Sequence, residues 1–120
     1  STQSITGLLD EAVSAIRRVH AQRPTIGVVL GSGLGAFGDT LEDASRIGYQ
    51  DIPNMPMSRV VGHAGVLSLG RVENVPVACM QGRVHLYEGH EPERVVFGVR
   101  MLVRLGCEVV LITNAAGGVH

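Results

Sequence analysis

The sequence contains no lysine, and all ten of its basic side chains are arginine. This absence excludes a P-loop lysine, a Schiff-base lysine and a lysine general base from the chain. The formal net charge of −1 provides no electrostatic footprint for nucleic acid. No apolar run approaches the roughly 18 residues of a membrane span, and no basic segment followed by an apolar one marks a signal peptide. These absences favour a cytoplasmic protein that binds neither nucleic acid nor membrane.

Cysteine is also scarce, with only Cys79 and Cys107 in the chain. Both lie in apolar, strand-like surroundings, which predicts two buried, unpaired thiols in a reducing compartment. The sequence has no C-x-x-C or H-E-x-x-H spacing, so we expect no metal site. Its 120 residues, 45% of them hydrophobic, suffice for the core of one compact domain.

Hydrophobic periodicity predicts strands that alternate with helices, which indicates an α/β fold with a mixed, partly parallel central sheet flanked by helices. A hairpin is expected at Glu73-Asn74, and Gly106 is expected to end the second helix. Residues 36–58 lack a sustained period and predict mostly loop with some weak helix. The predicted helices are residues 4–22 and 92–105, and the predicted buried strands are residues 25–30, 66–72, 75–80 and 108–113.

The most informative segment is residues 81–90, which combines a guanidinium, two imidazoles, a phenol and a carboxylate. If the preceding strand continued in extended form, Arg83, His85 and Tyr87 would share one face. That face suits an anion such as phosphate, because the arginine fork donates two parallel hydrogen bonds and a histidine adds a third. The alternative is a polar loop whose charges pair with nearby glutamates.

Two glycine-rich segments, residues 31–36 and 114–118, each follow a predicted strand. The first also fits the dinucleotide fingerprint G-x-G-x-x-A, but Gly38 interrupts the helix that the fingerprint requires, and no apolar strand precedes Asp51. Its backbone amides and the Ser32 hydroxyl could instead approach an anion, since glycine has no Cβ. A tight turn without a ligand is the other alternative.

These segments and Gly62-His63-Ala64-Gly65 occur in an order that closely resembles the purine nucleoside phosphorylase family, in its trimeric, low-molecular-mass branch. The resemblance runs from Ile26 to the last residue. It implies a nucleoside phosphorylase-like fold in which residues 1–120 are the N-terminal part of a single α/β phosphorylase domain, with an incomplete sheet. The sequence stops two residues after Gly118, inside a predicted loop, so we also expect a neighbour of strand 108–113 from residues beyond it.

The resemblance implies phosphorolysis of purine (2′-deoxy)ribonucleosides to the free base and (2-deoxy)ribose 1-phosphate. Inorganic phosphate is then a co-substrate, no cofactor or metal is needed, and the complete protein is a homotrimer. The family motifs imply catalytic roles for His85 and Glu88, with Glu88 orienting His85. The implied phosphate ligands are Ser32, His63, Arg83, His85 and Ala115, and the implied nucleoside contacts are Tyr87, Ala115, Ala116 and Gly117.

Two alternatives remain open from the sequence. One is the sister methylthioadenosine phosphorylase group, although threonine replaces serine at the Ser32 position in that group. The other is a catalytically inactive, phosphate-binding fragment. The purine preference is also open, because the family's base-reading acid and asparagine lie beyond the last residue of this chain.

Overall fold

The computed structural model describes residues 4–30, 35–55, 65–81 and 91–113. Within these residues, two long helices and five strands form the fold, and two short 3-10 helices, η1 and η2, precede and follow β2 in the sequence. Their bounds in chain order are α1 Ile5–Val19, β1 Ile26–Val29, η1 Gly35–Thr40, β2 Glu42–Gly48, η2 Tyr49–Asp51, β3 Val66–Val72, β4 Val75–Gln81, α2 Glu91–Leu105 and β5 Val109–Ile112.

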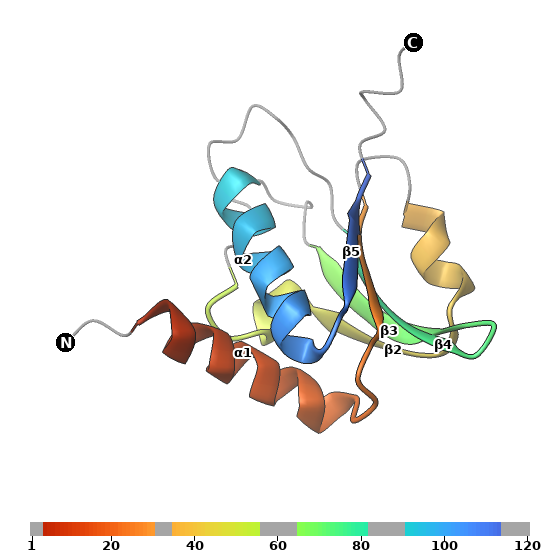
Figure 1. Cartoon of the computed structure of the whole chain (residues 1–120), viewed down its shortest axis with the longest axis horizontal. Helices are drawn as coiled ribbons and strands as arrows, with labels where there is room; N and C mark the ends of the chain where they lie inside the picture. The colour runs from red at the N-terminus through yellow and green to blue at the C-terminus, as the bar shows by residue number, and fades with distance from the viewer. Residues whose placement is uncertain (1–3, 31–34, 56–64, 82–90, 114–120) are drawn as a thin grey trace, which may run out of the picture.

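The strands form one mixed sheet in the order β2-β3-β4-β1-β5 (Figure 1). β1 is parallel to both of its neighbours, β4 and β5, whereas β2, β3 and β4 pair antiparallel. The connection through α2 therefore leaves β4, passes β1 and returns on its far side as β5. The predicted α/β class with a partly parallel sheet is confirmed.

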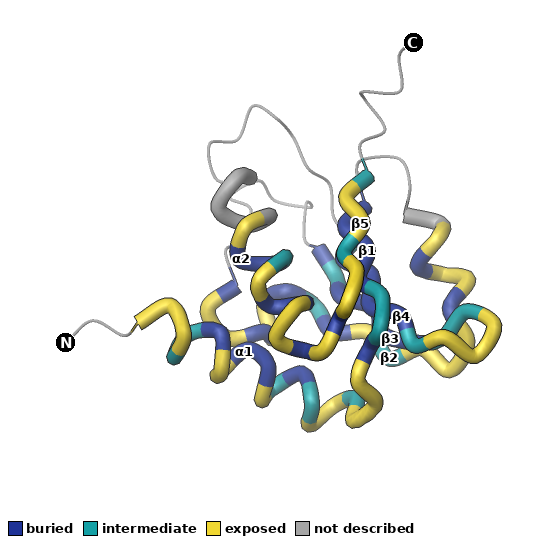
Figure 2. The backbone as a smooth tube through the Cα atoms, in the orientation of Figure 1, coloured by how far each residue is buried: buried dark blue, intermediate teal, exposed yellow. Residues whose placement is uncertain are grey.

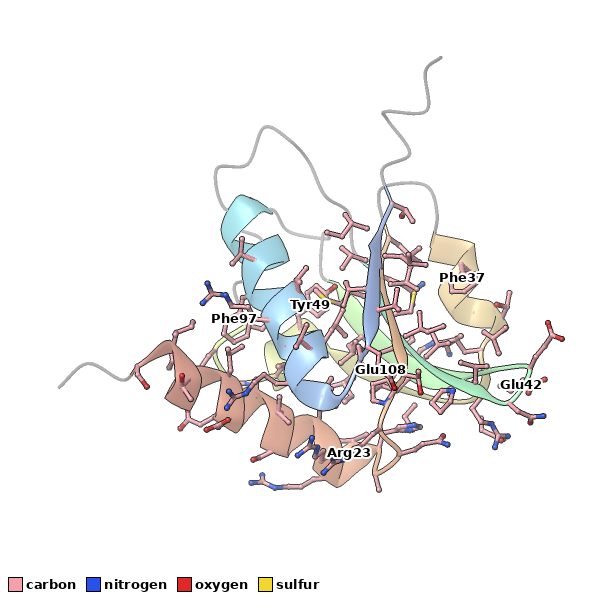
Figure 3. The ribbon with its side chains drawn as sticks, in the orientation of Figure 1. Arg23, Phe37, Glu42, Tyr49, Phe97 and Glu108 are labelled. Atoms are coloured by element: carbon pink, nitrogen blue, oxygen red, sulfur yellow. The ribbon has the colours of Figure 1, made fainter. Side chains whose placement is uncertain are left out.

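The sheet separates two apolar layers, because alternate side chains of a strand point to opposite faces. α1 and α2 pack together on one face, and η1 contacts β4 on the other (Figure 1). Figure 3 shows Tyr49 and Phe97 on the helix side of the sheet and Phe37 on the η1 side. The η1-side core comprises Val28, Leu30, Leu41, Val77 and Cys79, whereas Val29, Ala78 and Met80 of the same strands belong to the larger helix-side core.

The predicted helices are confirmed, with local signals at their ends. The Ser4 hydroxyl accepts a hydrogen bond from the Gly7 amide at 3.2 Å and caps α1. Gly106 follows α2 with a φ of 124°, a left-handed conformation that favours glycine and ends the helix. The predicted hairpin is also present, because Glu73 and Asn74 join β3 to β4 with φ values of 47° and 71°.

The loop prediction for residues 36–58 is wrong in part, because Glu42–Gly48 forms the strand β2. This strand occupies one edge of the sheet and is mostly exposed, so it lacks the apolar alternation on which the prediction relied. Asp43 has a φ of 52°, and the pairing with β3 shifts register between Glu42 and Ser45. Such a bulge further masks the two-residue period of a strand.

β5 differs from its prediction as a buried strand. Within the described residues it pairs only with β1 and forms the other edge of the sheet. Val109, Leu111 and Ile112 are 49%, 52% and 61% exposed, and Figure 2 shows this strand as largely exposed. The strand therefore presents apolar side chains together with an unpaired backbone edge, a combination that promotes association with another strand.

We expect the 120-residue chain alone to self-associate through β5, and Leu111→Lys to reduce that association by adding a charge to the edge. Sedimentation velocity over a concentration series measures the effect. Val75→Lys is the matched control, because Val75 is 38% exposed but lies at the β3–β4 hairpin. Equal association of the native chain and both variants would assign the contact to another surface.

Candidate functional site

The residues predicted to bind substrate belong to four segments, residues 31–34, 56–64, 82–90 and 114–120, that lie outside the described residues. The described chain nevertheless determines where these segments join the sheet. The predicted site residues concerned are Ser32, His63, Arg83, His85, Tyr87, Glu88, Ala115, Ala116 and Gly117.

All four segments join the sheet at the same end of its strands, the end at which β1, β4 and β5 have their carboxyl termini. Val29 is in register with both Met80 and Ile112 at the carboxyl ends of the parallel strands. β3 runs antiparallel to β4, so its first residue, Val66, pairs with Gln81 at the same end. Four adjacent strand ends span roughly 15 Å, at about 4.8 Å per strand spacing. The carboxyl ends of parallel strands are where α/β folds bind ligands.

Hydrogen bonds to the neighbouring strand hold two of these junctions. The Leu30 amide donates to the carbonyl of Met80 at 2.9 Å, which ties the residue before segment 31–34 to β4. Both the amide and the hydroxyl of Thr113 donate to the carbonyl of Val29, at 2.9 and 3.1 Å. The residues that precede the two glycine-rich segments are therefore fixed on adjacent strands.

A close contact holds the junction after segment 56–64. The Tyr49 amide donates to the carbonyl of Gly65 at 3.1 Å. A Cβ on Gly65 would lie 2.1 Å from a ring carbon of Tyr49, which is 4% exposed. Only glycine fits here without displacing the buried ring. Gly65, two residues after the predicted site residue His63, therefore has a packing role that the motif Gly62-His63-Ala64-Gly65 did not indicate.

Gln81 forms the fourth junction, immediately before the segment that carries Arg83 and His85. Its Oε1 accepts a hydrogen bond at 2.7 Å from the hydroxyl of Ser68, a fully buried residue of β3. Neither side chain was predicted to have a role. A serine within the apolar run of β3 was the available signal, because a buried hydroxyl requires a partner.

Cys79 and Cys107 are both buried and free, as predicted. Burial, and secondarily the negative charge of Asp39, raises the pKa of the Cys79 thiol to about 12. Burial raises the pKa of Cys107 to about 11. Both thiols are therefore protonated at neutral pH, which makes them poor nucleophiles and poor metal ligands.

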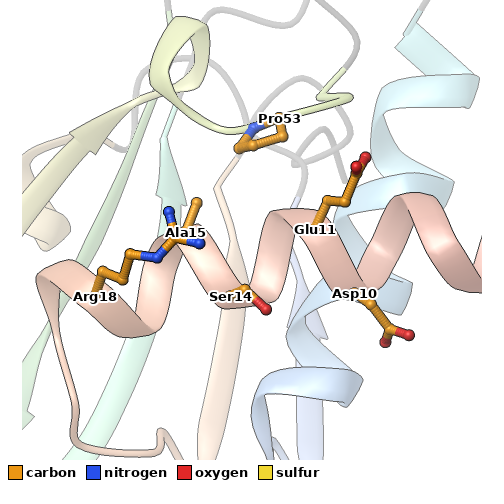
Figure 4. Close-up of a pocket in the computed structure, with 6 residues that line it drawn as sticks. All are labelled: Asp10, Glu11, Ser14, Ala15, Arg18 and Pro53. Atoms are coloured by element: carbon orange, nitrogen blue, oxygen red, sulfur yellow. The ribbon is translucent and has the colours of Figure 1, made fainter.

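A depression of about 410 Å³ lies beside α1 and Pro53, away from the strand ends that join the four segments (Figure 4). It contains none of the predicted site residues. Its lining residues are Asp10, Glu11, Ser14, Ala15, Arg18 and Pro53.

Among the described residues, no group of histidine, cysteine, aspartate and glutamate could hold a metal ion. No helix in that part of the chain is long and apolar enough to cross a membrane.

Comparison with known proteins places this arrangement in a family. The profile of the phosphorylase superfamily matches residues 25–120. The chain belongs to this superfamily. It is 47% identical over 112 residues to purine nucleoside phosphorylase 1 of Bacillus subtilis, a match that covers 93% of this chain and 41% of that relative. The predicted resemblance to purine nucleoside phosphorylases is confirmed.

Solved structures agree with the fold. A purine nucleoside phosphorylase in complex with ribose 1-phosphate superposes with a TM-score of 0.83 at 34% identity, covering 95% of this chain and 42% of that one. The Schistosoma mansoni enzyme in complex with inosine has a TM-score of 0.79 at 34% identity, covering 91% and 38%. The present chain thus spans about two fifths of the length of these relatives.

We expect the native protein to react very slowly with a thiol reagent at about pH 8, because both thiols are buried and protonated. The denatured, unreduced protein should release two thiol equivalents, one from each cysteine. A colorimetric thiol titration measures both states. Titrations of Cys79→Ala and Cys107→Ala assign the equivalents. Finding no thiol in the denatured protein would overturn the reducing environment inferred from the sequence.

Proposed function

We propose that this chain forms the phosphate-binding part of an enzyme that cleaves purine (2′-deoxy)ribonucleosides by phosphorolysis. One observation carries the proposal: the four segments with family motifs join the sheet side by side, three at the carboxyl ends of the parallel strands β4, β1 and β5 and one at the start of the antiparallel β3. The 47% identity to a purine nucleoside phosphorylase and the likeness to structures that hold inosine or ribose 1-phosphate support the substrates.

The proposed roles follow the motif positions. Ser32, Arg83, His85 and the amide of Ala115 bind phosphate, and Glu88 orients His85. His63 lies near phosphate and the sugar. Tyr87 packs against the ribose, while Ala115, Ala116 and Gly117 line the purine pocket. Together with His63, these donors belong to segments that join four neighbouring strands, an arrangement that suits an anion surrounded by hydrogen-bond donors.

Phosphate itself is the nucleophile in this reaction. One of its oxygens forms a bond to C1′ of the pentose while the bond from C1′ to the purine nitrogen breaks. The electron pair leaves with the base, which takes up a proton. The protein's task is to hold the phosphate against C1′, where its charge stabilises the developing ribosyl cation. This chemistry requires neither a protein nucleophile nor an organic cofactor.

The proposal extends to the setting of the complete protein. The complete protein acts as a homotrimer in the cytoplasm and uses inorganic phosphate as co-substrate without a metal ion. The two free, buried thiols support a reducing compartment. Methylthioadenosine phosphorylase is the weaker candidate, because the relatives described above are purine nucleoside phosphorylases and residue 32 is serine.

The proposal predicts phosphate-dependent cleavage of inosine or guanosine. The suitable protein is the extended chain, defined as these 120 residues followed by the part of the Bacillus subtilis relative beyond its matched region. Hypoxanthine release from inosine should require phosphate or arsenate. Equal turnover in phosphate-free buffer would indicate a hydrolase, and preference for methylthioadenosine would favour the rival group.

The 120-residue chain alone serves as the comparison protein. It should release no detectable base, because the purine-reading residues of the family are absent and β5 exposes an apolar edge. Adding the missing part, in the same chain or as a second one, should restore activity. Cleavage of inosine by a monodisperse 120-residue protein would refute the assignment of only half a site to this chain.

Arg83→Ala in the extended chain should lower kcat/KM at least about 10–100-fold, because a charge-assisted hydrogen bond contributes roughly 1.5–3 kcal/mol. The loss should be largest when phosphate is the varied substrate. Arg71→Ala is the matched control, since Arg71 pairs with Asp43 and lies opposite Pro76 near the hairpin. Unchanged kcat and phosphate KM in Arg83→Ala would make Arg83 a structural residue.

A further inference from the structure

The Gln81 carboxamide occupies a partly buried position between three elements. Gln81 is the last residue of β4, and Cys79, two residues earlier, packs in the η1-side core. Strand alternation therefore directs the Gln81 side chain to the same face. There its Oε1 accepts the hydrogen bond from Ser68 at 2.7 Å.

The same carboxamide lies directly against the backbone of Gly38 in η1. A Cβ on Gly38 would be 2.2 Å from Oε1 and 2.3 Å from Cδ of Gln81, well inside van der Waals contact. The absent side chain of Gly38 thus provides the space that the carboxamide fills. β4 and η1 also contact each other at other positions, so this is a packed junction.

These contacts connect two of the segments that carry predicted phosphate ligands. η1 begins at Gly35, directly after the segment with Ser32. Gln81 directly precedes the segment with Arg83 and His85. One partly buried side chain, that of Gln81, therefore contacts the element that follows one predicted phosphate-binding segment and directly precedes the other.

We propose that Gln81 is a positioning residue for phosphate, held by Ser68 and packed on Gly38. The inference rests on the proposed phosphorolysis. Donors from two separate segments bind one anion well only when their spacing is fixed before the anion arrives, and small displacements reduce the rate strongly. The carboxamide sets that spacing by keeping the end of β4 against the start of η1.

A packing role without effect on phosphate would look different in kinetics. Loss of general stability lowers the amount of active enzyme and leaves both KM values unchanged. Loss of positioning raises the KM for phosphate and leaves the KM for the nucleoside nearly unchanged. The split between these two constants distinguishes the roles.

The test uses Gln81→Met in the extended chain, because methionine keeps a similar length and volume but cannot accept the Ser68 hydrogen bond well. We expect a phosphate KM raised about tenfold, consistent with one lost hydrogen bond that leaves a buried hydroxyl unpaired. The inosine KM should change less than about twofold. Initial rates with phosphate and inosine varied in turn provide both constants.

Three further variants connect the effect to the observed contacts. Ser68→Ala should raise the phosphate KM in the native background, and should add little in the Gln81→Met background. Gly38→Ala keeps every hydrogen-bonding group but displaces the carboxamide, so it should act in the same direction even if Gln81→Met folds poorly. Ser45→Ala removes a comparable hydrogen bond, between Ser45 Oγ and His20 Nδ1 at 3.1 Å, and should leave the phosphate KM unchanged.

The outcomes separate the two proposals. An active extended chain whose Gln81→Met, Ser68→Ala and Gly38→Ala variants keep the native phosphate KM overturns the positioning role alone. Parallel increases in both KM values also overturn it. An extended chain that is inactive with native Gln81, but folded by circular dichroism, overturns the proposed function and the positioning role with it.

Discussion

The parallel pairing of β1 with β4 on one side and β5 on the other is the constraint on which the rest of the structure depends. Because of this pairing, the carboxyl ends of the three strands lie side by side. The pairing also requires the crossover through α2, which covers one face of the sheet. Four segments that are distant in sequence thereby join the sheet side by side. Without this pairing, the residues of the proposed phosphate site would share no common location.

The polar contact between Ser68 and Gln81, in an otherwise apolar layer, adds a second constraint at the same end of the strands. Ser68 is fully buried, and its hydroxyl reaches Gln81 rather than water. An apolar residue at position 68 would avoid the cost of burying a hydroxyl but would remove the hydrogen bond between Ser68 and the carboxamide. The proposed positioning role explains why a polar pair occupies a place where packing alone favours apolar side chains.

The sequence predicted those parts of the fold whose signals are local. The periodicity of α1, the Glu73-Asn74 turn and Gly106 after α2 each have a direct physical cause within a few residues. β2 was missed, because an exposed edge strand with a bulge has no apolar alternation. The site residues were selected by motif, but their anchors depend on contacts such as Gly65 with Tyr49 that link distant residues. Such contacts leave no periodic trace in the sequence.

The two edges of the sheet are physically different. β2 has the features of a stable edge, with exposed charged residues, a bulge and the left-handed Asp43. β5 has the apolar composition of an interior strand, yet its only described partner is β1. Covering Val109, Leu111 and Ile112 would remove apolar surface from water and pair the free backbone edge, both of which are favourable. Pairing of another strand with β5 would therefore be favourable at a place next to the strand ends that join the proposed phosphate site.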